Sequence, residues 1–189
     1  MSNIEFLTNY VNGFSKLLED SAKRSINKLI EISDIIKEAN KNGKKVLIFG
    51  NGGSSAIASH FSVDLTKNAG FRCVNFNEAD LLTCFSNDFG YERWVEKSID
   101  FYADEGDVII LISSSGNSQN MVNGVTASRN KNVYKIITLT GFDNLNRLRK
   151  LGDINIWVDS KAYNHVENIH QFFLLSIVDL LIGNSEYSA

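Results

Sequence analysis

The chain has 189 residues, 43% of them hydrophobic, and a formal net charge of −3. This length and composition suit one folded domain with a substantial core. No basic run accompanies the negative charge, which excludes broad binding to the phosphate backbone of nucleic acids. No window reaches the roughly 18 uninterrupted apolar residues of a membrane span. The first residues lack a basic segment followed by an apolar run, so we expect no secretory signal and a cytoplasmic location.

Cys73 and Cys84 are too few for a disulfide framework. Both lie in apolar stretches, so we expect two buried free thiols. The chain has no proline, and no change in composition marks a domain boundary. The sequence therefore predicts a single domain over 1–189, with an α/β core over 42–189.

Residues 3–41 have the spacing of one long amphipathic helix. Apolar residues recur every three or four positions from Ile4 to Ile36. Ser21 and Ser25 interrupt this stripe, which indicates either a break in the helix or a close approach of another backbone. The near-heptad spacing favours packing on a second subunit. The alternative is that the helix covers the core of its own chain.

Beyond residue 42, short apolar runs alternate with helical patterns. The expected strands are 45–49, 72–76, 107–112, 134–140 and 154–158. The expected helices are 56–65, 92–103, 119–130, 145–151 and 166–182. Residues 80–86 are expected to form a helix or a turn, with a loop at 87–90. Strands that are apolar almost throughout are typical of a parallel sheet covered on both faces.

Two polar loops follow predicted strands, at the sheet edge where ligands bind in such folds. The first, 50–55, reads Gly-Asn-Gly-Gly-Ser-Ser. Glycines let the backbone approach a ligand, and the amides at a helix start favour an anion. The spacing fits neither a Walker P-loop nor G-x-G-x-x-G, so we expect no nucleotide cofactor. A plain tight turn is the alternative.

The second loop, 113–118, reads Ser-Ser-Ser-Gly-Asn-Ser. Its hydroxyls and amides could surround a phosphate without any arginine or lysine. Helix capping is the alternative, but capping requires only one serine.

Two further pairs carry titratable groups. His60 and Asp64 are four residues apart and share a helix face, which suits proton transfer or metal binding. A surface hydrogen bond is the alternative. Glu167 and His170 lie at the start of the last helix, where the alternative is a charge that favours the helix terminus.

Four segments, in this order and spacing, resemble the sugar isomerase (SIS) domain family. They are 46–55, 60–66, 86–90 and 112–118. Within the family, the chain is most similar to the sedoheptulose 7-phosphate isomerases, over nearly its whole length.

This resemblance implies a fold and an activity. The fold would be a flavodoxin-like three-layer α/β/α arrangement, with a five-stranded parallel sheet. The assembly would be a homotetramer, with 1–41 as the oligomerisation region. The reaction would convert sedoheptulose 7-phosphate to D-glycero-D-manno-heptose 7-phosphate through an enediol. It is an early step towards the heptose of bacterial surface polysaccharides such as lipopolysaccharide.

The resemblance also implies roles for individual residues. The phosphate would be held by Ser113, Ser114, Ser115 and Ser118. The sugar would be lined by Asn51, Gly52, Gly53, Ser54 and Ser55, with Asn87 and Asp88 opposite and Glu167 as a further contact. His60 matches a family histidine that can bind zinc.

The chain departs from the family at three positions. Asp64 stands in place of the glutamate presumed to be the base, and its side chain is about 1.5 Å shorter. Glu167 replaces a glutamine that contacts substrate and metal, and Leu175 replaces a distal catalytic histidine.

A shifted catalytic set could compensate for these changes. Glu167 could act as the base, or His60, Asp64 and Glu167 could form a three-ligand zinc site with one open position. The only other histidines are His165 and His170, so any other imidazole acid would be one of these two.

Two alternatives to this isomerase stay open. One is a non-catalytic SIS module that binds a sugar phosphate or a protein. A tetrameric branch that associates with the replication initiator DnaA is of this kind, and it also lacks the distal histidine. The other is an isomerase of a different sugar phosphate. Leu175 favours the binding module, whereas the retained sugar and phosphate loops favour an enzyme.

Overall fold

Five parallel strands form the central sheet of the computed structural model, which describes residues 1–187. Their order is β2-β1-β3-β4-β5, and every neighbouring pair is parallel. The strands are β1 (Val46–Phe49), β2 (Cys73–Asn75), β3 (Val108–Ser113), β4 (Lys135–Thr140) and β5 (Ile154–Trp157). This is the flavodoxin-like order, whose direction of winding reverses between β1 and β3. The predicted fold class is confirmed.

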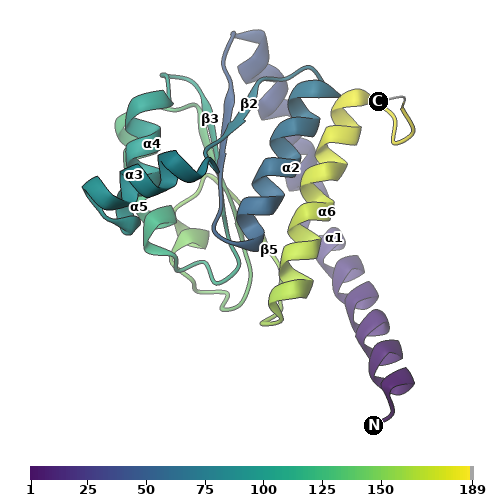
Figure 1. The fold of residues 1–189 in the computed structure, drawn as a ribbon. Helices are drawn as coiled ribbons and strands as arrows, with labels where there is room; N and C mark the ends of the chain where they lie inside the picture. Colours follow the sequence, from purple (N-terminus) through teal and green to yellow (C-terminus); the bar gives the residue numbers. More distant parts are fainter. Residues whose placement is uncertain (188–189) are drawn as a thin grey trace.

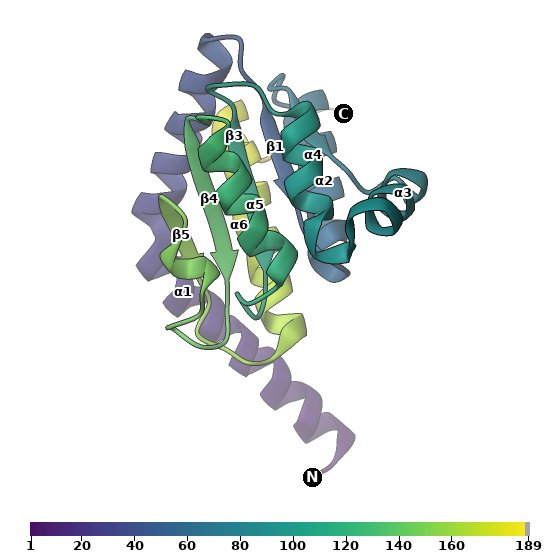
Figure 2. The same ribbon diagram turned by 90° about the vertical axis from the view of Figure 1, so that its left-hand side faces the viewer.

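Helices cover both faces of the sheet (Figures 1 and 2). One face carries α1 (Asn3–Lys41), α2 (Gly53–Lys67) and α6 (Tyr163–Ile182), and the other carries α4 (Trp94–Tyr102) and α5 (Gln119–Asn130). The remaining elements are α3 (Ala79–Phe89) and the short 3-10 turns η1 (Tyr91–Arg93) and η2 (Leu148–Lys150). None of these helices, within residues 1–187, is both long and apolar enough to span a lipid bilayer.

Alternation along the strands produces two separate hydrophobic cores. In β1 and β3, Ile48 and Ile110 point to the cluster beneath α1, α2 and α6, whereas Leu47 and Ile109 point to the cluster beneath α4 and α5. All four side chains are fully buried. The near-continuous apolar runs in the sequence therefore reflect strands that are covered on both faces.

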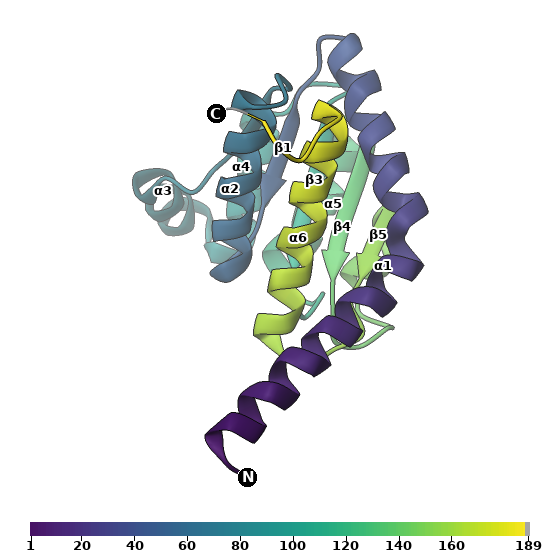
Figure 3. The same cartoon turned by 90° about the vertical axis from the view of Figure 1, so that its right-hand side faces the viewer.

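The two halves of α1 have different surroundings. The second half packs on the core through buried residues such as Ile32 and Ile36. Ser21 and Ser25 are also buried, and the helix continues through them without a break. Residues 3–13 are all exposed, and this part of the helix projects beyond the sheet (Figure 3). The alternative that the helix covers the core of its own chain therefore holds for the second half of α1 only.

Several predicted details are wrong. The predicted helix over 145–151 is only the 3-10 turn η2, Leu148–Lys150. α3 continues to Phe89, so 87–89 are helical; the turn signal marks the helix end at Gly90, whose φ is 88°. α6 starts three residues early, at Tyr163, whose ring packs edge-on against Phe142. Cys73 is buried as expected, but Cys84 is exposed on α3; both thiols are free.

Candidate functional site

A small cavity lies at the carboxyl ends of β1 and β3, where the two polar loops meet. Its volume is about 130 Å³, and it is lined by Asn51, Ser54, Ile112, Ser113, Ser114, Ser115, Ser118, Tyr163 and Glu167. The structure thus brings together the four predicted phosphate residues, two of the predicted sugar residues and Glu167. Tyr163 was not anticipated, because its contribution depends on the early start of α6.

The serine loop is built for more than helix capping. Ser118 holds the N-cap position of α5, yet its hydroxyl makes no capping hydrogen bond and instead pairs with the Ser113 hydroxyl at 3.0 Å. The Ser114 hydroxyl is buried and has no hydrogen-bond partner within residues 1–187. A buried unpaired hydroxyl is unfavourable unless a ligand satisfies it. None of the described residues that line the cavity is a lysine or arginine, so an anion here would be held by hydroxyls and helix-start amides.

The glycine loop brings the start of α2 to the same cavity. Gly52 occupies the N-cap position with a φ of 55°, a conformation that favours glycine. At Gly53, a β-carbon would overlap the carboxylate of Glu167 from α6. Ser54 is buried against the cavity, but Ser55 does not line it; its carbonyl accepts a hydrogen bond from Asn77. The missing side chain at Gly53 therefore makes room for Glu167.

A second polar cluster joins α2 to α6. His60 Nε2 lies 3.2 Å from Asp64 Oδ2, as their spacing predicted, and His60 Nδ1 lies 3.2 Å from Gln171 Nε2. An amide nitrogen only donates, so His60 Nδ1 accepts and Nε2–H donates to Asp64. Gln171 was missed by the sequence analysis. It lies one helical turn beyond Glu167 and one turn before Leu175, so the periodicity of α6 could have indicated it.

The three-ligand zinc site is not formed within one chain. Among residues 1–187, no group of three or more His, Cys, Asp or Glu side chains is arranged to hold a metal ion. His60 and Asp64 are paired, but the carboxylate of Glu167 lies against Gly53. Both ring nitrogens of His60 are already hydrogen-bonded. The donor set of a single chain therefore does not fit the expected metal, and we derive no step through it.

His170 is part of the core and cannot supply an acid to the cavity. It is fully buried, and its Nε2 donates to the carbonyl of Thr140 at 3.1 Å. Burial lowers the pKa of His170 to about 4. His165 contacts α1, with ring centroids 4.4 Å from Tyr10 and 5.5 Å from Phe14. The prediction that His170 could supply an imidazole acid is therefore wrong.

Asn87 and Asp88 do not line the cavity in a single chain. They lie on the last turn of α3, are exposed, and hydrogen-bond to each other at 2.9 Å. The prediction that they line the sugar opposite the 51–53 loop is therefore not met within one protomer.

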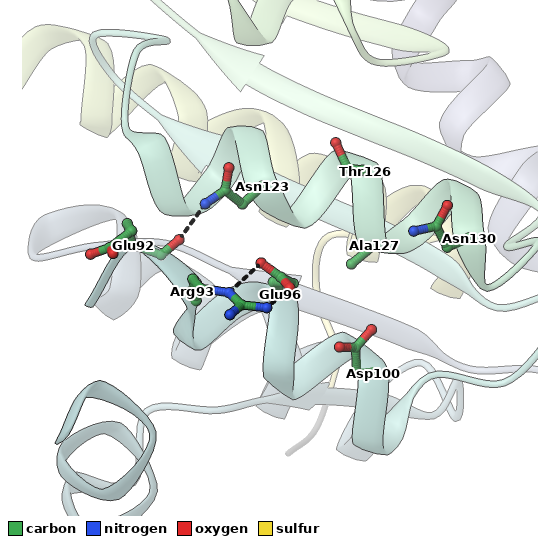
Figure 4. Close-up of a pocket in the computed structure, with 8 residues that line it drawn as sticks. All are labelled: Glu92, Arg93, Glu96, Asp100, Asn123, Thr126, Ala127 and Asn130. Carbon is green, nitrogen blue, oxygen red and sulfur yellow. Dashed lines mark hydrogen bonds and ion pairs between the residues drawn. The ribbon is translucent and has the colours of Figure 1, made fainter. Parts of the chain in front are cut away.

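A larger hollow of about 340 Å³ lies between α4 and α5 (Figure 4). Its lining residues are Glu92, Arg93, Glu96, Asp100, Asn123, Thr126, Ala127 and Asn130. Arg93 forms an ion pair of 2.6 Å with Glu96. No residue of either polar loop lines this hollow, so it is not the site that the sequence predicts.

Comparison with known proteins identifies the family. Residues 9–141 match the SIS domain. The chain is 34% identical to a phosphoheptose isomerase of Proteus mirabilis, over 93% of this chain and 91% of that protein. It is 32% identical to one of Buchnera aphidicola, over 87% and 91%. The chain belongs to the phosphoheptose isomerase family of SIS-domain proteins.

Solved structures agree with this assignment at the level of the fold. A phosphoheptose isomerase from Francisella tularensis has a TM-score of 0.90 at 22% identity, and covers 97% of this chain with 100% of its own. One from Neisseria gonorrhoeae has a TM-score of 0.89 at 24% identity, over 96% and 100%. The resemblance drawn from the four sequence motifs is confirmed.

Proposed function

We propose that this chain is a ketose–aldose isomerase that converts sedoheptulose 7-phosphate to D-glycero-D-manno-heptose 7-phosphate. One observation carries the proposal: a carboxylate, Glu167, and the four serines of the 113–118 loop line the same small cavity. The serines suit a phosphate, and the carboxylate suits proton transfer on the adjoining sugar. The seven-carbon substrate is supported by the relatives named phosphoheptose isomerase.

The reaction needs a base and a group that polarises the carbonyl. The base removes a proton from the carbon next to the carbonyl, and the electron pair left behind forms the enediolate. Return of a proton to the former carbonyl carbon, with a hydroxyl proton moving to the other oxygen, gives the aldose. We assign the base to Glu167, because its carboxylate lies in the cavity at the start of α2. Asp64, held by His60, is the second candidate.

The proposal includes a homo-oligomer, with a tetramer as the expected form. Two features support it. The projecting part of α1 exposes Ile4, Leu7 and Val11, and an apolar groove of about 390 Å³ lies between α1 and α6, with Ile26 and Phe172 in its lining. Exposed apolar surface of this kind marks contact sites. We also propose a cytoplasmic location, with which the two free cysteines agree.

A non-catalytic binding module is the second candidate function. The observation that favours it is Leu175 on α6, an apolar side chain where the family resemblance implies a catalytic histidine. Such a module would keep the phosphate cavity but would not interconvert the sugars. An isomerase of another sugar phosphate is a variant of the first proposal.

Product analysis with ketose phosphates of different length tests these proposals. Purified protein is incubated with sedoheptulose 7-phosphate, and separately with five- and six-carbon ketose phosphates, and aldoses are identified by NMR. We expect the seven-carbon aldose to form fastest. Faster conversion of a shorter ketose would reassign the substrate. Saturable binding without any product would establish the binding module.

A further inference from the structure

The side-chain amide of Asn51 is enclosed by two residues that the family motifs did not suggest. Asn51 Nδ2 donates to Asn120 Oδ1 at 3.0 Å, and Asn120 Nδ2 donates back to Asn51 Oδ1 at 3.0 Å. The hydroxyl of Tyr91 also lies 3.0 Å from Asn51 Oδ1. These residues come from the loop after β1, from α5 and from η1.

A pair of facing amides is ambiguous on its own, because both could be turned over together. A backbone group removes the ambiguity here. The N–H of Met121 can only donate, and it is shared between the Ser118 carbonyl oxygen at 3.1 Å and Asn120 Oδ1 at 3.0 Å. An Asn120 amide turned over would place its NH2 group against this N–H. Asn120 must therefore keep its oxygen towards Met121 and Asn51 Nδ2, and its nitrogen towards Asn51 Oδ1. Asn120 is almost completely buried, so water does not compete for these positions.

This orientation decides what Asn51 offers to the cavity that it lines. Its oxygen is engaged by Asn120 and Tyr91, so both lone pairs are used. Its nitrogen has two hydrogens, of which one goes to Asn120. The remaining hydrogen is the only hydrogen-bonding capacity that the side chain retains. Asn51 is thus a donor and not an acceptor towards a ligand.

Because Asn51 can only donate, the substrate atom that it binds must be a hydrogen-bond acceptor. In a ketose phosphate the hydroxyl groups both donate and accept, whereas the carbonyl and phosphate oxygens only accept. The serine loop lines the same cavity and its hydroxyls suit the phosphate, which leaves the carbonyl oxygen as the acceptor for Asn51. We propose that Asn120 and Tyr91 are positioning residues that hold Asn51 as the hydrogen-bond donor to the carbonyl oxygen of the substrate. This inference rests on the proposed isomerase function, and assigns the group that polarises the carbonyl.

The kinetic test uses substitutions that change hydrogen bonding but not size. Asn120→Asp places a carboxylate oxygen against Asn51 Oδ1, and Tyr91→Phe removes one hydroxyl. A well-placed donor to a developing oxyanion contributes a factor of about a hundred to kcat, so we expect Asn120→Asp to lower kcat at least about tenfold, and Tyr91→Phe to lower it less. KM and the binding of inorganic phosphate should change little, because the serine loop is untouched. Asn130→Asp, exposed at the end of the same helix and outside the cavity, is the matched control.

Several results would overturn the inference. One is an Asn120→Asp variant with wild-type kcat. Another is a fall in kcat that runs in parallel with lost phosphate binding, as a purely structural defect would produce. Neutron diffraction on the deuterated wild-type protein tests the orientation without turnover, and so separates this inference from the proposed function. Deuterium on the Asn51 atom that faces Asn120 Oδ1 supports it, and deuterium on the atom that faces Tyr91 contradicts it.

Discussion

The carboxylate of Glu167 on α6 lies directly in front of Gly53, the first residue of α2, in space that a β-carbon would otherwise fill. The start of a helix stabilises negative charge through its free amides and its dipole. The contact therefore places Glu167, the one carboxylate among the described residues that line the cavity, against a group of positive character. It also links the packing of two helices to the chemistry of the site.

Gly53→Ala tests this contact through stability. In the wild-type background the added methyl must displace Glu167, and overpacking of this kind costs about 1–3 kcal/mol. In a Glu167→Ala background the same change should be neutral or stabilising by up to about 1 kcal/mol, because alanine is favoured over glycine in a helix. Urea unfolding of the four proteins measures the coupling. Equal effects of Gly53→Ala in both backgrounds would show that the two residues do not interact.

Ser114→Ala tests the phosphate role of the serine loop. The Ser114 hydroxyl makes no hydrogen bond within residues 1–187, so its removal should leave the free energy of unfolding almost unchanged. A hydrogen bond to a charged group contributes about 1.5–3 kcal/mol, so affinity for inorganic phosphate should fall at least about tenfold. Calorimetric titration measures this. Ser128→Ala is the contrasting control, since that buried hydroxyl donates to Gly124 and its loss should reduce stability but not phosphate affinity. Unchanged phosphate affinity in Ser114→Ala would remove the serine from the site.

His170 predicts a pH dependence of stability. Burial lowers its folded pKa to about 4, against about 6.5 in an unfolded chain. Between these values the unfolded state binds more protons, so stability is fully present above pH 6.5 and is lost as the pH falls towards 4. The loss between pH 7 and pH 5 should be about 2 kcal/mol. Urea unfolding of the wild type and of His170→Gln, which can still donate to Thr140, measures it. A wild-type slope that persists in the variant would assign the effect to other groups.

The projecting half of α1 predicts the behaviour of surface variants. Val11 is 58% exposed on the apolar stripe, and Asn9 lies on the opposite face of the helix. If this stripe contacts a second copy, Val11→Glu should lower the mass of the particle in light scattering, whereas Asn9→Glu should not. A monomeric wild-type protein would contradict the proposed assembly.

Most of the fold could be predicted from the sequence because local patterns and tertiary structure agree there. The apolar runs of β1 and β3 are neighbouring strands buried on both faces. Their carboxyl ends meet at one edge of the sheet, which explains why the two polar loops converge. The end of α3 could not be predicted, because Asn87 and Asp88 favour turns and only the Gly90 terminus shows that they close a helix.

The sequence predicted which residues form the site better than it predicted how they contact one another. The serines and Asn51 follow from their place after strands. The contact of Glu167 with Gly53 depends on how α2 packs on α6. No local sequence pattern predicts that packing. His170 is different: it lies four residues after the buried Val166 and four before the buried Leu174. The spacing of apolar residues along α6 therefore indicated that His170 lies in the core. The prediction was missed because a titratable side chain suggests a functional role instead.

Solvent exchange shows whether this chain is an isomerase and whether Glu167 is its base. The protein is incubated with sedoheptulose 7-phosphate in deuterated water, with and without added zinc, and followed by NMR beside a Glu167→Gln variant. We expect deuterium to enter the carbon next to the carbonyl as the aldose appears, without a need for zinc. Loss of the general base should slow this exchange by about a hundredfold or more. Saturable binding of the sugar phosphate with no deuterium incorporation would contradict an isomerase, and wild-type exchange in Glu167→Gln would contradict Glu167 as its base.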